Sequence, residues 1–350
     1  MNNRIGSGTK LHKTVKPPRF YGWTIAGVVS LLVFVGGVET NPVLGVIQGP
    51  ITEEFGWSRA TFTLPMAIGT FAGGIAAVFM GPIMDRRGSR GVMTVAVAMM
   101  GTLFVAMSLM QSLWQFFILQ ILGRTLVAST FFIVVGVVIP KWFITKRGRA
   151  VGLSSLGLRF GHAVYPIVVG LVMAVAGWRA ASMALGISVW VLALGPTIAL
   201  LKRRPEDIGQ FPDGRTRDLR VQESSTSPSV SEISFTRKEA LRTRAFYYLL
   251  GALAIQMFVA TGINFHWYSY LIGNGVTPSA TVTSLAIAPL VGMPATIVTG
   301  YAVEKVPPRL VLAFGSLLCA MSLALFLFAD NSLMAIAFGV SYGIAIGMRL

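Results

Sequence analysis

The segment GPIMDRRGSR, from Gly81 to Arg90, recurs in weaker form as GYAVEKVPPR, from Gly300 to Arg309. Each copy lies where a long apolar stretch reaches a short basic loop. The matched pairs are Gly81 with Gly300, Asp85 with Glu304, Arg86 with Lys305, and Arg90 with Arg309. A repeat of this length in an apolar chain indicates a protein built from two related halves.

The composition is that of a membrane protein. The chain has 350 residues, of which 54% are hydrophobic and 12% charged, and its mean hydropathy is +0.70. A soluble domain carries about 25% charged residues, and a bilayer core about 30 Å thick needs about 20 apolar residues per helix. The sequence therefore predicts an all-α membrane protein with about ten transmembrane helices, over residues 21–48, 59–80, 91–111, 114–138, 150–176, 180–201, 246–272, 279–303, 309–328 and 331–348.

The positions of the basic residues along the chain indicate the membrane topology. The net charge of +16 would suit a nucleic-acid partner, but 25 of the 29 Lys and Arg residues fall in one set of alternating loops and at the two termini. Basic residues accumulate in cytoplasmic loops. We therefore expect no nucleic acid as partner, and a multi-pass protein of the inner (plasma) membrane with both termini in the cytoplasm.

A long polar stretch divides the chain. We expect a cytoplasmic tail over residues 1–20, a six-helix bundle over 21–201, a cytoplasmic linker over 202–245 and an incomplete bundle of about four helices over 246–350. The basic N-terminus lacks a small-residue cleavage site, so no removable signal peptide is predicted. The single cysteine, Cys319, excludes an intramolecular disulfide and a cysteine-rich metal site.

Ionisable side chains inside apolar spans are candidates for function, because their burial in a bilayer is costly. Arg124 lies in the fourth span with Gln120 one turn before it, and it is a candidate for binding an anion. Alternatively, Arg124 ties two helices together through backbone carbonyls. In the fifth span, Arg159 is a candidate for holding a carboxylate by bidentate bonds. His162, three residues later, is a candidate for carrying a proton or for ordinary packing.

Two further candidates lie towards the other side of the membrane. Glu39, in the first span, would take up a proton during transport or would reach the external water. His266, in the segment NFHWYSY of the seventh span, would line a cavity, and the neighbouring Trp267, Tyr268 and Tyr270 would suit an interfacial aromatic belt. Soluble-enzyme motifs such as a P-loop or a nucleophile elbow are absent from the sequence. The sequence thus predicts no enzyme, no cofactor and no metal.

The first repeat copy also resembles a family motif. It matches the G-x-x-x-D-R-x-G-x-R loop of the major facilitator superfamily, except that Gly91 replaces a final basic residue. The segments EEFGWSRA (53–60), KWFITKRGRAVGLSSLG (141–157), AGWRAA (176–181) and RRPEDIGQFPDG (203–214) look like bacterial relatives of the monocarboxylate transporters. This resemblance covers nearly the whole chain.

The resemblance implies two six-helix bundles around a central cavity, alternating access, and small organic anions that move with protons. It also implies that Asp85 is part of a conformational latch, paired with Arg90 and with the positive end of a helix in the outward-facing state. Alternatively, this segment is a solvated loop that serves topology only. The expected latch residues are Gly81, Asp85, Arg86, Gly88 and Arg90, with Gly300, Glu304, Lys305 and Arg309 in the second copy. The family has twelve helices, whereas ten are predicted here, and the eighth span lacks the charged residues usual in this branch.

The sequence thus predicts a secondary transporter that moves a small organic anion, of monocarboxylate type, with a proton. Its predicted partners are that anion, protons and the lipid bilayer, and a monomer is expected. One alternative is a proton antiporter or efflux transporter of another small molecule, which two membrane-buried arginines disfavour for cationic cargo. Another is a non-transporting membrane sensor or a truncated, inactive product.

Overall fold

The computed structural model describes residues 20–214 and 237–348. These residues form helices and loops without strands, which confirms the all-α prediction. Within this part of the chain, eight helical stretches are long and apolar enough to cross a membrane, and the apolar helix Ser332–Gly347 is shorter. The predicted tail up to residue 19 and the part of the predicted linker over 215–236 lie outside the described residues.

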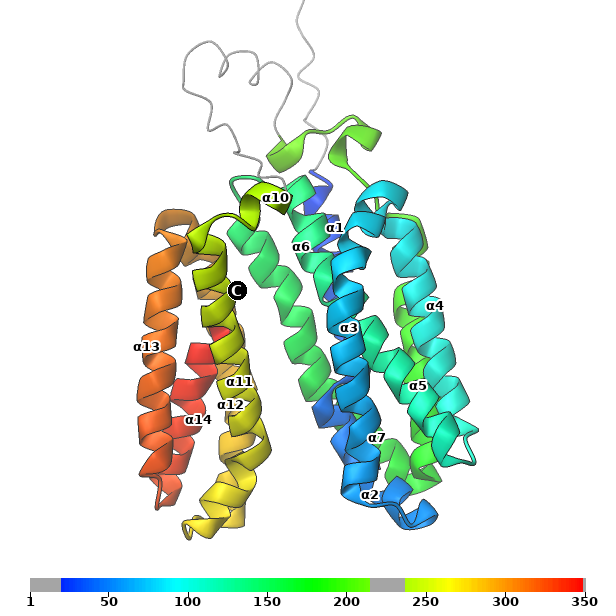
Figure 1. Cartoon of the computed structure of the whole chain (residues 1–350), viewed down its shortest axis with the longest axis vertical. Coiled ribbons are helices and arrows are strands. Elements are labelled where there is room, and N and C mark those ends of the chain that lie inside the picture. Colours follow the sequence, from blue (N-terminus) through cyan, green and yellow to red (C-terminus); the bar gives the residue numbers. More distant parts are fainter. Residues whose placement is uncertain (1–19, 215–236, 349–350) are drawn as a thin grey trace, which may run out of the picture.

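The first group of helices is coloured blue to green in Figure 1. It consists of α1 (Gly22–Gly36), η1 (Gly37–Glu39), α2 (Asn41–Phe55), α3 (Arg59–Arg87), α4 (Ser89–Ser108), α5 (Leu113–Leu126), η2 (Val127–Phe131), α6 (Ile133–Trp142), α7 (Arg147–Val189), η3 (Trp190–Leu194) and α8 (Gly195–Leu200). The helix α7 contains the non-helical residue Gly177, with φ 76° and ψ 175°. Glycine tolerates this conformation because it has no Cβ. The turn at Gly177 divides α7–α8 into the fifth and sixth predicted spans.

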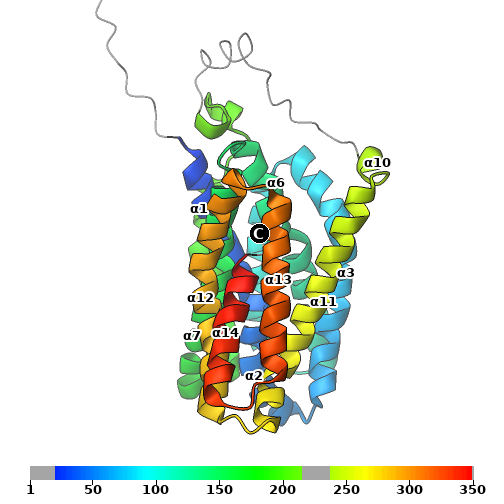
Figure 2. The ribbon, with the colours of Figure 1, turned by 90° about the vertical axis from the view of Figure 1, so that its left-hand side faces the viewer.

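The second group is coloured yellow to red. It consists of α11 (Arg244–Gly273), α12 (Pro278–Lys305), α13 (Pro308–Leu327) and α14 (Ser332–Gly347). The connection from the first group includes η4 (Pro205–Ile208), η5 (Pro212–Gly214) and α10 (Arg237–Ala240). Helix α14 packs between α12 and α13 (Figure 2). We call the end of the molecule that carries η4, η5 and α10 the linker end, and the other the distal end.

Each group has its own apolar core, and glycines allow the closest helix contacts within the first group. A methyl group added at Gly69 would come within 2.6 Å of the Arg124 Cβ, and one added at Gly73 would come within 2.6 Å of the Ala128 Cβ. Gly161 similarly faces the backbone of α1. Small residues at this spacing let helix backbones approach in lipid. Gly69 and Gly73, four residues apart, therefore form a face of α3 that packs against α5.

Among the described residues, the two groups meet mainly where α7 packs on α12. Figure 1 shows the part of α7 before the turn at Gly177 running obliquely. This part begins at the linker end, towards the second group, and reaches the distal end beside α2. The α7–α12 contact therefore joins the two groups near the linker end.

Candidate functional site

A break in the first span places Glu39 in a buried position in the first group, with Asn41 exposed two residues later. Helix α1 ends at Gly36, η1 follows, and Thr40 is extended, with φ −104° and ψ 160°. Pro42 lies in the first turn of α2, where its missing N–H costs nothing. The Thr40 hydroxyl donates to the Gly37 carbonyl at 2.6 Å. The break is thus stabilised locally.

Arg124 binds this break from α5. Its Nη1 donates to the backbone carbonyl of Glu39 at 2.8 Å, and its Nη2 donates to the Asn41 side-chain oxygen. The Arg124 Nε lies 4.0 Å from the Glu39 carboxylate, and the two side chains are 13% and 2% exposed. Arg124 is therefore held by partners within the first group. This geometry matches the alternative in which Arg124 ties two helices through backbone carbonyls.

Gln120 does not join this cluster. Its side chain is buried, and its amide nitrogen contacts the Met107 sulfur on α4 at 3.3 Å. The Gln120 side-chain carbonyl is buried without a hydrogen-bond partner in the described part of the protein. Its predicted role in binding substrate stays a prediction.

Arg159 spans the boundary between the two groups. From α7, its Nη2 donates to the Ile346 carbonyl on α14 at 3.1 Å, and its Nη1 lies against Gly292 on α12. A methyl group at Gly292 would come within 2.7 Å of that nitrogen. Arg159 is therefore a half-buried cation whose bond partner belongs to the second group. The sequence placed Arg159 in a span but gave no indication of this partner.

The two predicted histidines differ in their surroundings. His162 lies one turn after Arg159, and its Nε2 is buried without a hydrogen-bond partner among the residues described. His266 is exposed on α11, whereas the neighbouring Trp267 is 2% exposed and its indole donates to Ser284 on α12 at 3.1 Å. The Trp267 ring therefore packs in the core of the second group, and its place in an interfacial belt stays a prediction.

The second repeat copy contacts the start of α7. The Glu304 carboxylate accepts from the backbone N–H of Arg149 at 3.0 Å and pairs with the Arg149 Nε at 2.6 Å. The Arg149 guanidinium lies 4.5 Å from the centre of the Tyr301 ring. Gly300 and Gly148 bring the two backbones together beside this pair. The N–H groups of a first helical turn lack internal partners, so Glu304 binds the positive end of α7 from the other group.

The first copy has a different arrangement from the predicted one. The Asp85 carboxylate pairs with Lys141 at the end of α6, with 2.6 Å between the charged atoms, and not with Arg90. Gly88, with φ 85°, turns the chain between α3 and α4, so Asp85 and Arg90 lie on different helices on either side of this turn. A methyl group at Gly81 would meet no described atom within 4 Å. Arg86 and Arg90, like Lys305 and Arg309, are exposed.

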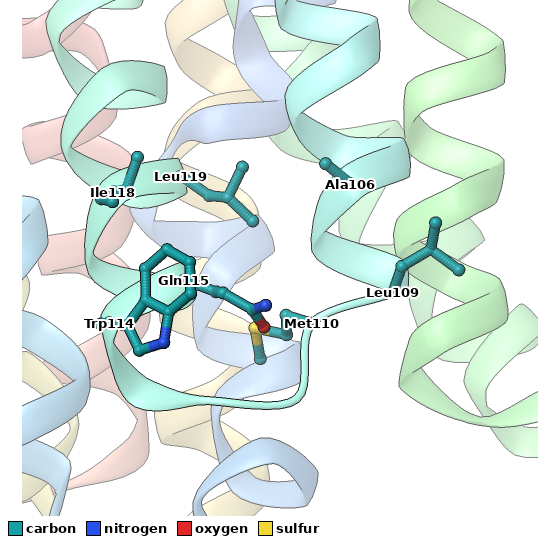
Figure 3. Close-up of a pocket in the computed structure, with 7 residues that line it drawn as sticks. All are labelled: Ala106, Leu109, Met110, Trp114, Gln115, Ile118 and Leu119. Atoms are coloured by element: carbon teal, nitrogen blue, oxygen red, sulfur yellow. The ribbon is translucent and has the colours of Figure 1, made fainter.

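A cluster at the distal end was not predicted as a contact. The Glu54 carboxylate accepts from the Trp178 indole at 2.7 Å and from Arg179 at 2.6 Å. Arg179 also donates to the Met110 carbonyl at 3.4 Å. The segments EEFGWSRA and AGWRAA, which carried part of the family resemblance, thus meet here. A shallow pocket between α4 and α5 lies at the same end (Figure 3) and is lined by Ala106, Leu109, Met110, Trp114, Gln115, Ile118 and Leu119. It contains none of the predicted site residues.

These helices and their contacts define a helical membrane protein with two groups that meet along α7 and α12. A family model for the Major Facilitator Superfamily matches residues 25–349, and the chain belongs to this family. This membership confirms the predicted fold class and the prediction of a transporter family rather than an enzyme.

Individual relatives are transporters. The chain is 31% identical to the probable L-galactonate transporter of Escherichia coli (strain K12) over 153 residues, which cover 43% of this chain and 34% of that protein. It is 22% identical to the gallate transporter of Pseudomonas putida, over 88% of this chain and 72% of that protein. This chain therefore matches about a third of the first relative's length.

A solved structure shows the same fold. The proton:xylose symporter XylE bound to 6-bromo-6-deoxy-D-glucose superimposes with a TM-score of 0.64, covering 94% of this chain and 79% of that chain. The sequence identity is 15%, so the likeness is one of fold alone.

Proposed function

We propose that the protein is a secondary transporter that moves a small organic anion together with protons by alternating access. The observation that carries this proposal is Arg159, a cation on the first group that bonds to a carbonyl of the second. A substrate bound at such a position contacts both groups, so its binding energy can couple to their relative movement. We take residues 21–201 and 246–350 as the two moving parts.

The proposed substrate is a carboxylate that also carries hydroxyl groups. Relatives are named as transporters of L-galactonate, gallate and 4-hydroxybenzoate. Each of these anions has one carboxylate and at least one hydroxyl, which supports a monocarboxylate. The carboxylate would replace the Ile346 carbonyl as the partner of Arg159. Arg159 is preferred to Arg124, whose donors already bind Glu39 and Asn41.

The proposed proton sites are Glu39 and His162. The Glu39 carboxylate is buried beside Arg124, so a proton on Glu39 would weaken the attraction that holds Arg124 at the break in the first span. His162 lies one turn from Arg159. An imidazole in contact with water takes up and releases protons near physiological pH. An anion that enters alone works against an inside-negative membrane potential, and a co-transported proton cancels that charge.

The proposed latch lies at the linker end. In this conformation, Glu304 and Arg149 connect the two groups beside the Gly148–Gly300 contact. We propose that these contacts close the linker end and separate when it opens. The positive-inside distribution of Lys and Arg supports a cytoplasmic linker end. We further propose that the protein resides in the inner membrane as a monomer.

Uptake by proteoliposomes tests this function. Labelled 4-hydroxybenzoate, gallate, galactonate and lactate would be compared with a panel of organic cations, with and without an inward proton gradient. We expect carboxylate uptake that the gradient stimulates, and a fall of roughly tenfold or more in Arg159→Ala. Arg59→Ala, which removes an exposed arginine at the distal end, is the matched control. Uptake of cations without any carboxylate uptake would refute the proposal.

A further inference from the structure

A short segment of the connection binds the ends of three helices in the first group. We call residues Arg203–Gly214 the strap. Arg203 donates to the Asp85 and Arg86 carbonyls at the end of α3, at 3.0 and 3.3 Å. Gln210 accepts from the backbone N–H of Tyr21 at the start of α1, at 2.9 Å. The strap therefore follows the linker end of the first group closely.

The third helix end belongs to α7, and Asp213 binds it. The Asp213 carboxylate accepts from the backbone N–H groups of Ile144, Thr145 and Lys146 at 3.2, 2.8 and 3.4 Å. It also accepts from the Thr145 hydroxyl at 2.9 Å. Four donors from one loop thus converge on a single carboxylate, and this loop leads directly into α7.

The residues around Asp213 favour the backbone conformation that it adopts. Asp213 has φ 60°, a left-handed conformation that aspartate tolerates better than most side chains do. It lies between Pro212, whose ring restricts the backbone, and Gly214, with φ 73°. A methyl group at Gly214 would come within 3.1 Å of the Phe20 side chain. The PDG sequence thus forms a tight turn that directs the carboxylate towards the α6–α7 loop.

Two carboxylates therefore bind the same helix start from different sides. Asp213 binds the N–H groups that precede α7, and Glu304 binds the N–H of Arg149 in its first turn. Negative charge near a helix N-terminus is favourable. Because Gly148 touches the backbone of α12 at this point, a small shift of the α6–α7 loop changes the contact between the two groups.

We infer that Asp213 is a positioning residue for the linker-end latch: through the α6–α7 loop, it holds the first turn of α7 where Arg149 meets Glu304. This inference rests on the proposed function, because it takes the Arg149–Glu304 contact to be the latch. It assigns to the strap a role in the balance between closed and open states of the linker end.

Distance measurements between spin labels test the inference in the full chain, reconstituted in lipid nanodiscs. Labels at Arg87→Cys on α3 and Leu310→Cys on α13 would report the separation of the two groups at the linker end, since both residues are exposed. Cys319→Ala removes the native thiol. We expect Asp213→Ala to raise the ratio of long to short distances roughly fivefold, as a coupling of about 1 kcal/mol would.

Further variants make the result decisive. Asp213→Glu should restore much of the short-distance population. Asp207→Asn should leave it unchanged, because Asp207 lies in the strap and, among the described residues, bonds only to the Arg204 N–H within it. Asp213→Ala combined with Glu304→Ala should shift the population no further than Glu304→Ala alone. Should Asp213→Ala lower the yield of folded protein, Asp213→Asn provides the same comparison.

The outcomes separate the inference from the proposed function. If Glu304→Ala shifts the distances and neither Asp213→Ala nor Asp213→Asn does, the inference is overturned and the latch stands. If Glu304→Ala has no effect, the proposed latch fails and the inference falls with it. A shift in Asp207→Asn equal to that in Asp213→Ala also overturns the inference, since the strap would then act only through its general stability.

Discussion

The two repeat copies allow one prediction with an internal control: Gly300→Ala should open the linker end, and Gly81→Ala should not. These glycines occupy matched positions in the repeat. A methyl group at Gly300 would lie 2.8 Å from the Gly148 carbonyl oxygen and 3.4 Å from the Arg149 Cα, whereas one at Gly81 would meet no described atom within 4 Å.

The magnitude follows from these distances. Ordinary van der Waals contact begins near 3.4 Å, so α7 and α12 must separate by about 0.6 Å to accommodate the Gly300→Ala methyl group. The obstructing atoms belong to the backbone, which cannot rotate away as a side chain can. Overpacking of this kind typically costs 1–3 kcal/mol, or roughly 5- to 150-fold in a two-state ratio. Alanine is also the better helix former, by about 1 kcal/mol, but this gain applies at both positions.

The assay is the distance distribution between labels at Arg87→Cys and Leu310→Cys, measured in nanodiscs, together with thermal unfolding. Gly300→Ala should increase the long-distance population at least about fivefold, while Gly81→Ala should leave the distribution unchanged and keep or slightly raise the melting temperature. An unchanged distribution in Gly300→Ala, or an equal shift in Gly81→Ala, would refute the argument that backbone contact at Gly300 closes the linker end.

Three further predictions concern stability, each measured by thermal or denaturant unfolding of the purified protein. Arg124→Met should lower the free energy of unfolding by about 3–5 kcal/mol, because it leaves Glu39 buried without its partner. Adding Glu39→Gln should recover most of this loss. An Arg124→Met variant as stable as the unmodified protein would contradict the ion pair. Trp267→Phe should cost about 1 kcal/mol through the lost hydrogen bond to Ser284, and a cost near zero would argue against that bond. Arg179→Ala should lower the free energy of unfolding by less than about 1 kcal/mol, because the Arg179–Glu54 ion pair is exposed to solvent. A larger loss would contradict the argument that exposure weakens this pair.

A local pattern of residues indicates which positions share one face of a helix. Spacings such as Gly69 with Gly73 mark one face of a helix, and the structure places that face against α5. The partners of charged residues were not predictable in this way. Arg124 reaches Glu39 across 85 positions, and Arg159 reaches Ile346 across 187. Such partners depend on how each helix is rotated and tilted against its neighbours, and a local pattern of residues does not contain that information.

By itself, the sequence determined the helical membrane fold, the approximate positions of the spans and the likeness of the two repeat copies. The physical reason is that a bilayer requires about 20 apolar residues per helix, a requirement that a linear pattern displays directly. Only the tertiary structure decided that Asp85 pairs with Lys141, whereas Glu304 binds the start of α7. The weaker copy of the repeat therefore makes the contact expected of the stronger one, because α7 lies within reach of Glu304 and no described helix lies against Gly81.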